Sequence, residues 1–234
     1  MEKNNQSSKE SIISVVETPE KFVVFLDIMG FKDRVMRTKH EKLKEELKQL
    51  SNRIVEVLES KNEGITCIQF SDSIILFTVN NSNSQLESLV SVSCLIMQRA
   101  IELGFAMKGA MAKGEITCDK AKNVYFGQAQ IDAYLLEENV WYYGIVVHHS
   151  AQSDVEKINE NYISTLELPM KTGSIKHCEL SWYAYDREKT TDIKKRISNI
   201  RYTVSDAPRR YIDNTEAVIK AFEERMNESR CVGV

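Results

Sequence analysis

The segment FVVFLDIMGF, residues 22–31, is a continuous apolar run that is interrupted by one acid, Asp27, and broken by Gly30. Such a run is typical of a strand that is covered on both faces of a sheet. A carboxylate at the end of a buried strand loses hydration, so it needs a compensating charge. The segment therefore predicts a buried strand that carries a functional acid at its end.

A second lone acid, Asp72, stands in a similar setting further along the chain. It lies in ITCIQFSDSIILFT, residues 65–78, where Ser71-Asp72-Ser73 separates two short apolar runs and predicts a hairpin. Two carboxylates that a fold brings together need a compensating charge even more, and a divalent cation is the usual one. The pair predicts a metal site on a sheet. A strand-end cap and a hairpin-turn aspartate are the common structural uses of the same two residues.

The remaining pattern predicts one α+β domain with a ferredoxin-like core. Apolar residues follow helical spacing over 31–60 and 85–103, and FAMKGAMAKGEI, residues 105–116, predicts a strand rich in small residues. The order β-α-β-β-α-β is the split ferredoxin-like arrangement, which brings both aspartates to one end of a shared sheet. Beyond this core we expect a helix, two strands and a helix at 126–138, 141–149, 179–186 and 207–228.

Composition and charge indicate a cytoplasmic protein with no general affinity for nucleic acid or membrane. Hydrophobic residues at 42% and charged residues at 28% are ordinary for a soluble protein, and a net charge of −3 offers no overall attraction to polyanions. The five cysteines form no CxxC pair, and their odd number, with no signal peptide, favours reduced thiols. No apolar stretch approaches the roughly 20 residues that span a bilayer.

Four sequence blocks, in this order, resemble the class III nucleotidyl cyclase catalytic domain over roughly residues 20–150. FVVFLDIMGF is similar to the first metal-binding strand of that family, FSDSIILF to its second metal hairpin, MKGAMAKGEI to its basic and small-residue strand, and YFGQAQIDAYLLEE to its Gly-led helix. Within the family, the hairpin, the strand and the helix look most like the pyrimidine cyclases of bacterial Pycsar antiphage systems. The C-terminal segment PRRYIDNTEAVIKAF is also similar to theirs.

This resemblance implies cyclisation of UTP or CTP to 3′,5′-cyclic UMP or CMP with release of pyrophosphate. It implies two Mg²⁺ or Mn²⁺ ions held by Asp27, Asp72 and the Ile28 carbonyl. It also places phosphate oxygens near backbone N–H groups after Gly30, where a helix begins at Phe31. It further implies a homodimer with shared active sites and a separate effector protein, which the cyclic nucleotide activates in antiphage defence.

The same resemblance divides the chain into three parts. We expect residues 1–20 to be a flexible N-terminus, residues 21–150 to form the cyclase catalytic core, and residues 151–234 to form a C-terminal extension packed on the same domain.

Three positions depart from the purine-using members of the family. Their Asn and Arg on the Gly-led helix fall on Ile131 and Leu135, counted from Gly127, and their purine-selecting Lys or Glu falls on Ile68. The chain is then either an enzyme with a changed base pocket and a relocated cation, or a non-catalytic nucleotide-binding sensor. We favour the enzyme, because a domain without catalysis has no need to retain the costly aspartate pair.

Several side chains are candidates for the relocated cation and for substrate contact. The candidate cations are Lys113, Lys108, Arg34 and Arg99, and Tyr134 is the candidate for contact with ribose or base. A solvated surface position is the ordinary alternative for each cation. His148 and His149 indicate zinc only weakly, because no acidic or cysteine ligand stands at a supporting spacing.

Overall fold

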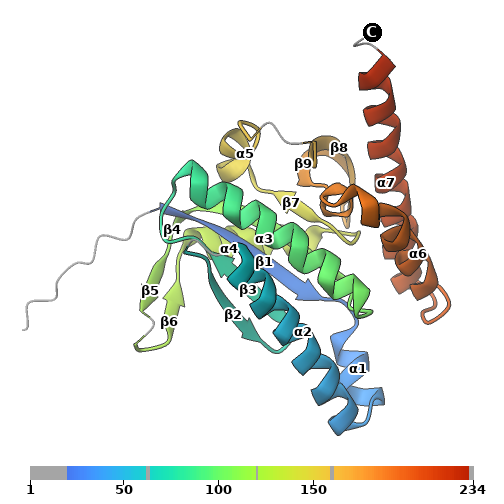
Figure 1. Ribbon diagram of the computed structural model, residues 1–234, viewed down its shortest axis with the longest axis horizontal. Helices are drawn as coiled ribbons and strands as arrows, with labels where there is room; N and C mark the ends of the chain where they lie inside the picture. The colour runs from blue at the N-terminus through green and yellow to red at the C-terminus, as the bar shows by residue number, and fades with distance from the viewer. Residues whose placement is uncertain (1–19, 62–63, 120, 159–160, 232–234) are drawn as a thin grey trace, which may run out of the picture.

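The computed structural model describes residues 20–61, 64–119, 121–158 and 161–231, with residues 229–231 as backbone only. A seven-stranded sheet forms the centre of the molecule, and helices cover both of its faces (Figure 1). The strand order is β2-β3-β1-β4-β7-β9-β8, and a separate small sheet pairs β5 with β6. The N-terminal segment that we expect to be flexible lies, except for Glu20, outside the described residues.

The described strands are β1 (Glu20–Ile28), β2 (Thr66–Phe70), β3 (Ser73–Phe77), β4 (Met107–Glu115), β5 (Thr117–Asp119), β6 (Val124–Phe126), β7 (Ile145–Val147), β8 (Ile163–Met170) and β9 (Gly173–Leu180). The described helices are α1 (Phe31–Arg37), α2 (His40–Lys61), α3 (Asn83–Glu102), α4 (Gln128–Asn139), α5 (His149–Val155), α6 (Thr190–Ile200) and α7 (Ala207–Cys231), with the 3₁₀ turns η1 (Trp182–Ala184) and η2 (Arg187–Lys189).

The predicted α+β class with a ferredoxin-like βαββαβ core is confirmed. The order β2-β3-β1-β4 is the one that the split arrangement gives, and every neighbouring pair among these four strands is antiparallel. Strands β7, β9 and β8 extend the same sheet beyond β4, and β7 runs parallel to β4. The arrangement of the first four strands therefore determines that Asp27, near the end of β1, lies at one end of the sheet.

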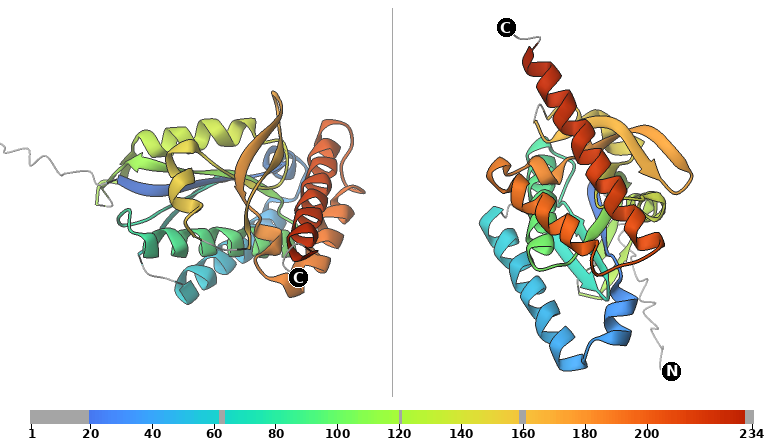
Figure 2. Two further views of the ribbon diagram at one scale, coloured as in Figure 1. Left: turned by 90° about the horizontal axis from the view of Figure 1, so that it is seen from above. Right: turned by 90° about the vertical axis from the view of Figure 1, so that its right-hand side faces the viewer.

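Strand β1 is buried on both faces because its alternate side chains meet different helices. Helices α3 and α4 lie on opposite sides of the sheet (Figure 2, left). The residues of β1 on the α2 and α3 side are Phe22, Val24, Leu26 and Ile28. On the other side, Val23 packs with Ala129 and Phe25 with Ala133, both from α4. The double cover explains why the sequence of β1 is apolar without alternation.

Small residues let β1 and α4 approach strand β4 closely. A Cβ atom added at Gly109 would lie 2.5 Å from the carbonyl oxygen of Phe25, and one added at Gly127 would collide with the backbone of Glu115. Glycine is therefore required at both positions by close approach of a neighbouring backbone. The small-residue strand in the sequence is the surface on which α4 packs.

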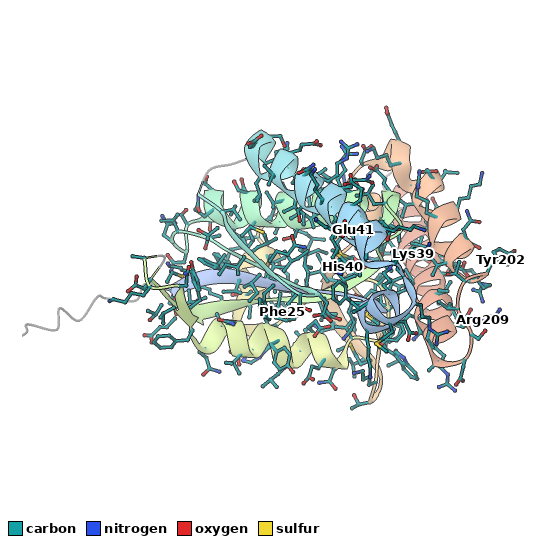
Figure 3. All side chains as sticks on the ribbon, turned by 90° about the horizontal axis from the view of Figure 1, so that it is seen from below. Phe25, Lys39, His40, Glu41, Tyr202 and Arg209 are labelled. Atoms are coloured by element: carbon teal, nitrogen blue, oxygen red, sulfur yellow. The ribbon has the colours of Figure 1, made fainter. Side chains whose placement is uncertain are left out.

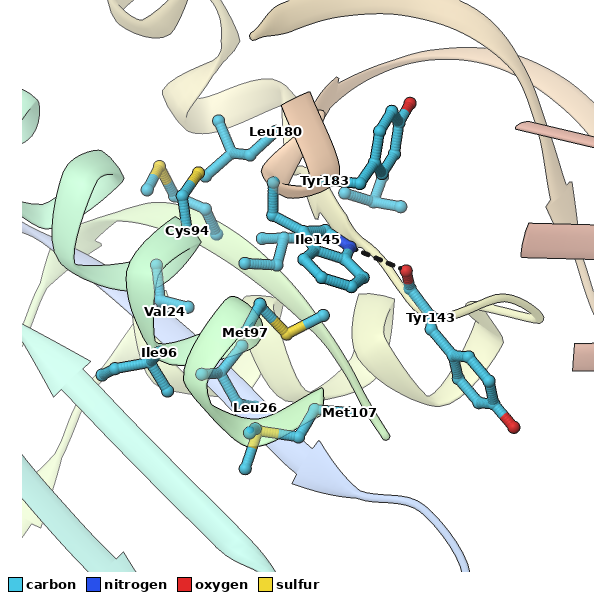
Figure 4. Packing of buried hydrophobic residues seen from close by; sticks show 14 of the residues in the cluster. Val24, Leu26, Cys94, Ile96, Met97, Met107, Tyr143, Ile145, Leu180 and Tyr183 are labelled. Atoms are coloured by element: carbon cyan, nitrogen blue, oxygen red, sulfur yellow. Dashed lines mark hydrogen bonds between the residues drawn. The ribbon is translucent and has the colours of Figure 1, made fainter. Parts of the chain in front are cut away.

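The main core continues from β1 into the C-terminal part of the chain. Val24 and Leu26 belong to the same cluster of buried side chains as Ile145 of β7 and Leu180 of β9 (Figure 4). Trp182 is only 1% exposed, and its Nε1 donates a hydrogen bond to the Tyr143 carbonyl oxygen at 2.8 Å. Residues beyond 150 therefore share one core with the first four strands.

Three expected elements differ from the structure. The single helix expected over residues 31–60 is wrong, because Thr38 takes an extended backbone conformation and separates α1 from α2. The strand expected at 179–186 is wrong beyond Leu180, because the following aromatic residues turn into the core as η1. The strand expected at 141–149 is shorter, since only Ile145–Val147 pairs with its neighbours.

Five elements carry no clear sequence signal and were not expected. They are β5, β6, α5, β8 and α6. Strands β5 and β6 are three residues long, too short for an alternation to be recognised. Helix α6 contains the segment KTTDIKKR, whose charges indicate a solvated patch, but Ile193 and Ile197 pack its other face into the core.

Candidate active site

The fold brings Asp27 and Asp72 to the same end of the sheet. Asp27 is the penultimate residue of β1, where it lies between Ser73 of β3 and Lys108 of β4 in the strand register. The backbone N–H of Ile28 donates a hydrogen bond to the backbone carbonyl of Asp72 at 2.9 Å. The turn that carries Asp72 is therefore attached directly to the end of β1.

A tight turn fixes the position of Asp72. Phe70 and Ser73 are paired across β2 and β3, so that Ser71 and Asp72 alone connect the two strands. Ser71 has a φ of 56°, a left-handed conformation that costs a residue other than glycine roughly 1–2 kcal/mol. The hairpin predicted at Ser71-Asp72-Ser73 is confirmed, and its short loop leaves Asp72 little freedom to move away from β1.

The site at the end of β1 carries an excess of negative charge. Burial raises the pKa of Asp27 to about 7, and the carboxylates of Glu137 and Asp72 add to the increase. The ammonium groups of Lys108 and Lys171 act in the opposite direction, but they do not compensate fully. A cation placed between these carboxylates would therefore be stabilised by the site.

Lys108 forms a buried ion pair with Glu137 of helix α4. Its Nζ atom lies 2.5 Å from Glu137 Oε1 and donates to the Glu137 carbonyl oxygen at 2.7 Å. Burial raises the pKa of Glu137, although Lys108 opposes that shift. Because Lys108 is also the register neighbour of Asp27, the pair packs α4 against the aspartate and holds the lysine in place.

The structure reveals a cation that the sequence did not single out. Lys171 lies in the turn between β8 and β9, and its backbone N–H donates to the carbonyl oxygen of Asn139 at 2.7 Å. Its side chain is exposed, yet its charge lowers the pKa of both Asp27 and Glu137, so its ammonium group lies within electrostatic range of their carboxylates. Neither flanking strand was clear from the sequence, and the turn therefore had no place in the predicted sheet.

Three of the four candidate cations lie in other pairs away from the aspartates. Lys113 is the register neighbour of Phe22, five residues along β4 from Lys108, and its Nζ lies 2.8 Å from Asp154 Oδ2. Five residues of strand span about 17 Å. Within one chain, the structure therefore does not bring Lys113 to the aspartate pair.

The two candidate arginines are also engaged. Arg34 of α1 pairs with Glu46 at 3.4 Å, donates to the Gly104 carbonyl oxygen, and lies over the ring of Phe105. Arg99 of α3 contacts both carboxylate oxygens of Glu102 at 3.0 Å. Both guanidinium groups are therefore engaged within the chain.

The other candidate residues lie close to the site. Tyr134 projects from α4 against the edge of the Phe25 ring, and its hydroxyl donates to Glu138 at 3.0 Å. That hydrogen bond raises the pKa of Tyr134, and Asp27 adds a smaller contribution. Gly30 adopts a left-handed φ of 72° directly before Phe31, where α1 begins. The turn from β1 into α1 thus follows Asp27 by three residues.

The positions that depart from purine-using cyclases present apolar side chains. Ile131 and Leu135 are each about half exposed on the outer face of α4. Ile68 is partly buried and packs beside Val23 and Phe77. The exposed apolar residues on α4 and on the β5–β6 hairpin are Val124, Phe126, Ile131, Tyr134 and Leu135.

The two aspartates do not belong to a larger cluster of potential metal ligands among the described residues. Among the described residues, no group of three or more His, Cys, Asp and Glu side chains is arranged to hold a metal ion. A cavity of about 340 Å³ lies between η1, η2 and α7, and its lining residues include none of the aspartate cluster.

In the described part of the chain, no helix combines the length and the apolar character of a membrane span.

Solved structures that resemble the chain include nucleotide cyclases, while no family model and no curated protein matches it. The adenylyl cyclase CyaB from P. aeruginosa aligns with a TM-score of 0.54 at 14% identity, over 69% of this chain and 93% of that one. The guanylate cyclase domain of RhGC from Catenaria anguillulae, in complex with GTP, aligns at 0.55 and 15% identity over 70% and 96%. A bacterial light-regulated adenylyl cyclase aligns at 0.53 and 12% identity over 76% and 97%.

These alignments define the architecture of the chain. Each covers nearly the whole of the matched cyclase chain, so the likeness is not confined to one motif. The protein has the class III nucleotidyl cyclase fold, with an acidic pair at the end of β1. At these identities the likeness concerns the fold, and activity has to be argued from the residues of the site.

Proposed function

We propose that this protein is a pyrimidine nucleotide cyclase, which converts UTP or CTP to the 3′,5′-cyclic monophosphate and pyrophosphate. The observation that carries the proposal is the pair Asp27 and Asp72, held together at one end of the sheet in a cyclase fold. In the reaction, a bond forms between the ribose 3′-oxygen and the α-phosphorus. The bond from that phosphorus to pyrophosphate breaks, and the 3′-hydroxyl loses its proton.

The aspartate pair fits divalent metal ions, for which we propose Mg²⁺ or Mn²⁺. Carboxylate oxygens are the hard ligands that these cations prefer, and the raised pKa of Asp27 shows that the chain alone leaves negative charge uncompensated. The Ile28 carbonyl is proposed as a further ligand. When bound, such ions supply Lewis-acid stabilisation of the reacting oxygens. Two carboxylates leave coordination positions for oxygens of the triphosphate.

The surrounding residues of the chain have separate roles in this proposal. The buried pair of Lys108 with Glu137 positions Asp27 through the register of β1 and β4. Lys171, exposed and within electrostatic range of the same carboxylates, binds the triphosphate. The backbone at Phe31, directly after Gly30, follows Asp27 closely in the chain and contacts phosphate oxygens. Tyr134 packs on Phe25, on the face of β1 that also carries Asp27, and contacts ribose or base.

Apolar side chains at the three departing positions support a pyrimidine substrate. Ile68 cannot form the hydrogen bonds and charge contacts by which purine-using members of the family select their base. Ile131 and Leu135 stand where those members have an Asn and an Arg. A site built without those groups gains nothing from the extra ring of a purine. The resemblance to pyrimidine cyclases leads us to propose an antiphage role, with a separate effector that responds to the cyclic nucleotide.

We also propose a homodimer with shared active sites. Five large apolar side chains are exposed together on α4 and the β5–β6 hairpin, and a second copy of the chain would cover them. Among the structures with the same fold, one is described as a dimeric guanylyl cyclase domain and another as an adenylate cyclase in its monomeric state. Concentration-dependent sedimentation, with Ile131→Asp as the variant, tests the dimer.

One observation favours the alternative of a non-catalytic nucleotide-binding sensor. All four cations considered from the sequence are engaged in ion pairs. A domain without a free transition-state cation would bind a triphosphate without converting it. The four-triphosphate experiment below separates these two functions.

The deciding experiment offers each of ATP, GTP, CTP and UTP to the purified protein with Mn²⁺ and measures cyclic nucleotide and pyrophosphate. We expect cyclic UMP or cyclic CMP, with purine products lower by about tenfold or more. Turnover of a purine triphosphate at an equal rate would contradict the pyrimidine assignment. Triphosphate binding without any cyclic product would establish the sensor.

A further inference from the structure

Helix α7 begins at the end of the sheet where the aspartates lie. In Figure 1 and in both views of Figure 2, its first turns lie beside the point at which β1 leads into α1, while its far end projects from the body. The helix runs from Ala207 to Cys231, and the sequence predicted it only as a charged C-terminal helix. Its start is the part of the C-terminal extension that is nearest to the candidate active site.

The start of α7 is attached to the segment that connects α4 to β7. Asn214 Nδ2 donates to the Trp141 carbonyl oxygen at 2.6 Å, and the Tyr143 N–H donates to Thr215 Oγ1 at 2.9 Å. The ring of Tyr211 stacks on that of Tyr143 with 6.0 Å between centroids. These contacts fix the rotation of α7 about its own axis, so that the residues on its inner face have defined positions.

The same segment is joined to the other parts of the site. The backbone N–H of Val140 donates a hydrogen bond, at 3.0 Å, to the carbonyl oxygen of Glu137, and Glu137 is the residue that pairs with Lys108. The carbonyl oxygen of Asn139 accepts from Lys171. Residues 139–143 therefore hold α4, the β8–β9 turn and α7 in one arrangement around the end of β1.

Tyr211 stands in the first turns of α7 and stacks on Tyr143, at the same end of the sheet as the acidic cluster. The residue is partly buried, and among the described residues its hydroxyl has no hydrogen-bond partner. Burial raises its pKa, and the charges of Glu137 and Asp27 add to that effect, so the hydroxyl lies within electrostatic range of both. A phenol hydroxyl without a hydrogen-bond partner is available to donate to a ligand.

Arg210 is the cation next to it. Its guanidinium lies over the Trp141 ring, 5.2 Å from the centroid, and it forms no ion pair within the described part of the chain. Asp213 and Glu216, two acidic residues in the first turns of α7, both form ion pairs with Arg201. Arg210 thus differs from the arginines at 34 and 99, whose charges are compensated.

We propose that helix α7 completes the catalytic site from the same chain, with Arg210 binding the triphosphate and Tyr211 donating a hydrogen bond to the bound nucleotide. This inference rests on the proposed function of the site. It assigns to α7 the positive charge that α4 lacks at Leu135. Arginine suits the task because its planar guanidinium donates two parallel hydrogen bonds to phosphate oxygens.

Two matched pairs of variants test the proposal. Arg210→Ala is compared with Arg209→Ala, the adjacent arginine, whose Nε donates to the Val204 carbonyl oxygen. Tyr211→Phe keeps the stacked ring and removes only the hydroxyl, and it is compared with Tyr202→Phe, whose residue is 84% exposed. Both control residues lie at the surface near the start of α7 (Figure 3).

We expect Arg210→Ala to raise the KM for the triphosphate or lower kcat/KM by about tenfold or more, with Arg210→Lys recovering part of the loss. Tyr211→Phe should lower kcat/KM about tenfold, and both controls should remain within twofold of wild type. Thermal unfolding of all five variants, measured alongside, separates loss of contact from loss of fold. Rates for Arg210→Ala and Tyr211→Phe equal to their controls would overturn the inference and leave the proposed cyclase intact.

Binding distinguishes the failure of this inference from the failure of the proposed function. If wild type forms no cyclic product from any triphosphate, the cyclase proposal fails, and the same variants are compared by titration of UTP and CTP with Ca²⁺ present. Weaker binding by Arg210→Ala and Tyr211→Phe than by their controls then supports the assignment of α7 to the site. Equal binding by variants and controls, or no binding by wild type, overturns it.

Discussion

Strand β4 carries a lysine ion pair near each end, and the two pairs behave in opposite ways. Lys108 and Glu137 have side chains only 6% and 4% exposed, and burial raises the pKa of the glutamate. Lys113 and Asp154 are 20% and 18% exposed, and the hydrogen bond from Lys113 lowers the pKa of the aspartate. In the Lys108–Glu137 pair, desolvation has the larger effect on the pKa of the acid. In the Lys113–Asp154 pair, attraction to the lysine has the larger effect.

The difference shows at which end of β4 the protein keeps buried carboxylates whose charge is not compensated. The end at Lys108 holds Asp27 and Asp72 as well, and its negative charge is not compensated by the chain. The end at Lys113 is balanced by its own residues and has the character of a structural ion pair. The proposed metal ions would compensate this imbalance.

The largest expected effect is loss of turnover at the acidic end. Asp27→Asn and Asp72→Asn should each lower the rate of cyclic nucleotide formation by about a thousandfold or more, because each removes a proposed metal ligand worth several kcal/mol. Asp154→Asn, the matched change at the other end of β4, should remain within about twofold. Circular dichroism confirms the fold of each variant. Substantial turnover in either active-site variant would remove the metal pair from the mechanism.

The next effect concerns stability and compares the two lysines. Lys108→Ala leaves Glu137 buried without a partner and should lower the free energy of unfolding by about 3–5 kcal/mol. Lys113→Ala breaks a partly exposed pair and should cost about 1 kcal/mol or less. Urea unfolding measures both. Replacement of both buried partners, Lys108→Met with Glu137→Leu, should recover most of the loss, and equal costs for the two single variants would contradict the comparison.

A smaller effect is expected at Lys171, the cation that only the structure brought to the site. Lys171→Ala should raise the KM for the triphosphate by about tenfold, because an exposed ammonium contributes modestly to phosphate binding. Lys176→Ala, a change of an exposed lysine on β9 of the same hairpin, is the control. Steady-state kinetics with Mn²⁺ in excess gives both values. An unchanged KM for Lys171→Ala would show that the turn does not contact substrate.

The smallest effect is a difference in pH dependence between the two acids. The raised pKa of Glu137 means that its contribution to stability is present below the pKa of the unfolded chain and is lost as pH rises through the folded value. The lowered pKa of Asp154 means the reverse: its contribution is present above the unfolded pKa and is lost as pH falls through the folded value.

Thermal unfolding of Glu137→Gln and Asp154→Asn is measured from about pH 3 to pH 8, so that the range also covers pH values below the ordinary pKa of an aspartate. Relative to wild type, Glu137→Gln should become more favourable as pH rises, and Asp154→Asn should become less favourable. Slopes of the same sign for the two variants would show that burial does not separate the two ends of the strand.

The sequence anticipated the parts of the fold that local pattern encodes. The run at 22–28 is apolar because both faces of β1 are covered, and Ser71-Asp72-Ser73 can only be a turn between two short apolar strands. These signals were sufficient to predict the order of the first four strands in the sheet. The strands β8 and β9 carry polar residues and an exposed hairpin, so their pattern did not distinguish them from loop, and Lys171 was missed with them.

The sequence by itself determined the acidic pair, the strand and hairpin that carry it, and the apolar character of the positions where purine cyclases have polar groups. Tertiary structure alone decided which charges surround that pair. Lys108 and Lys113 are equivalent in sequence, and only the register of β4 on β1 places one beside Asp27 and the other beside Phe22. Lys171 and Tyr211 approach the same aspartate from elements far along the chain, because electrostatic neighbours are set by packing and not by separation in sequence.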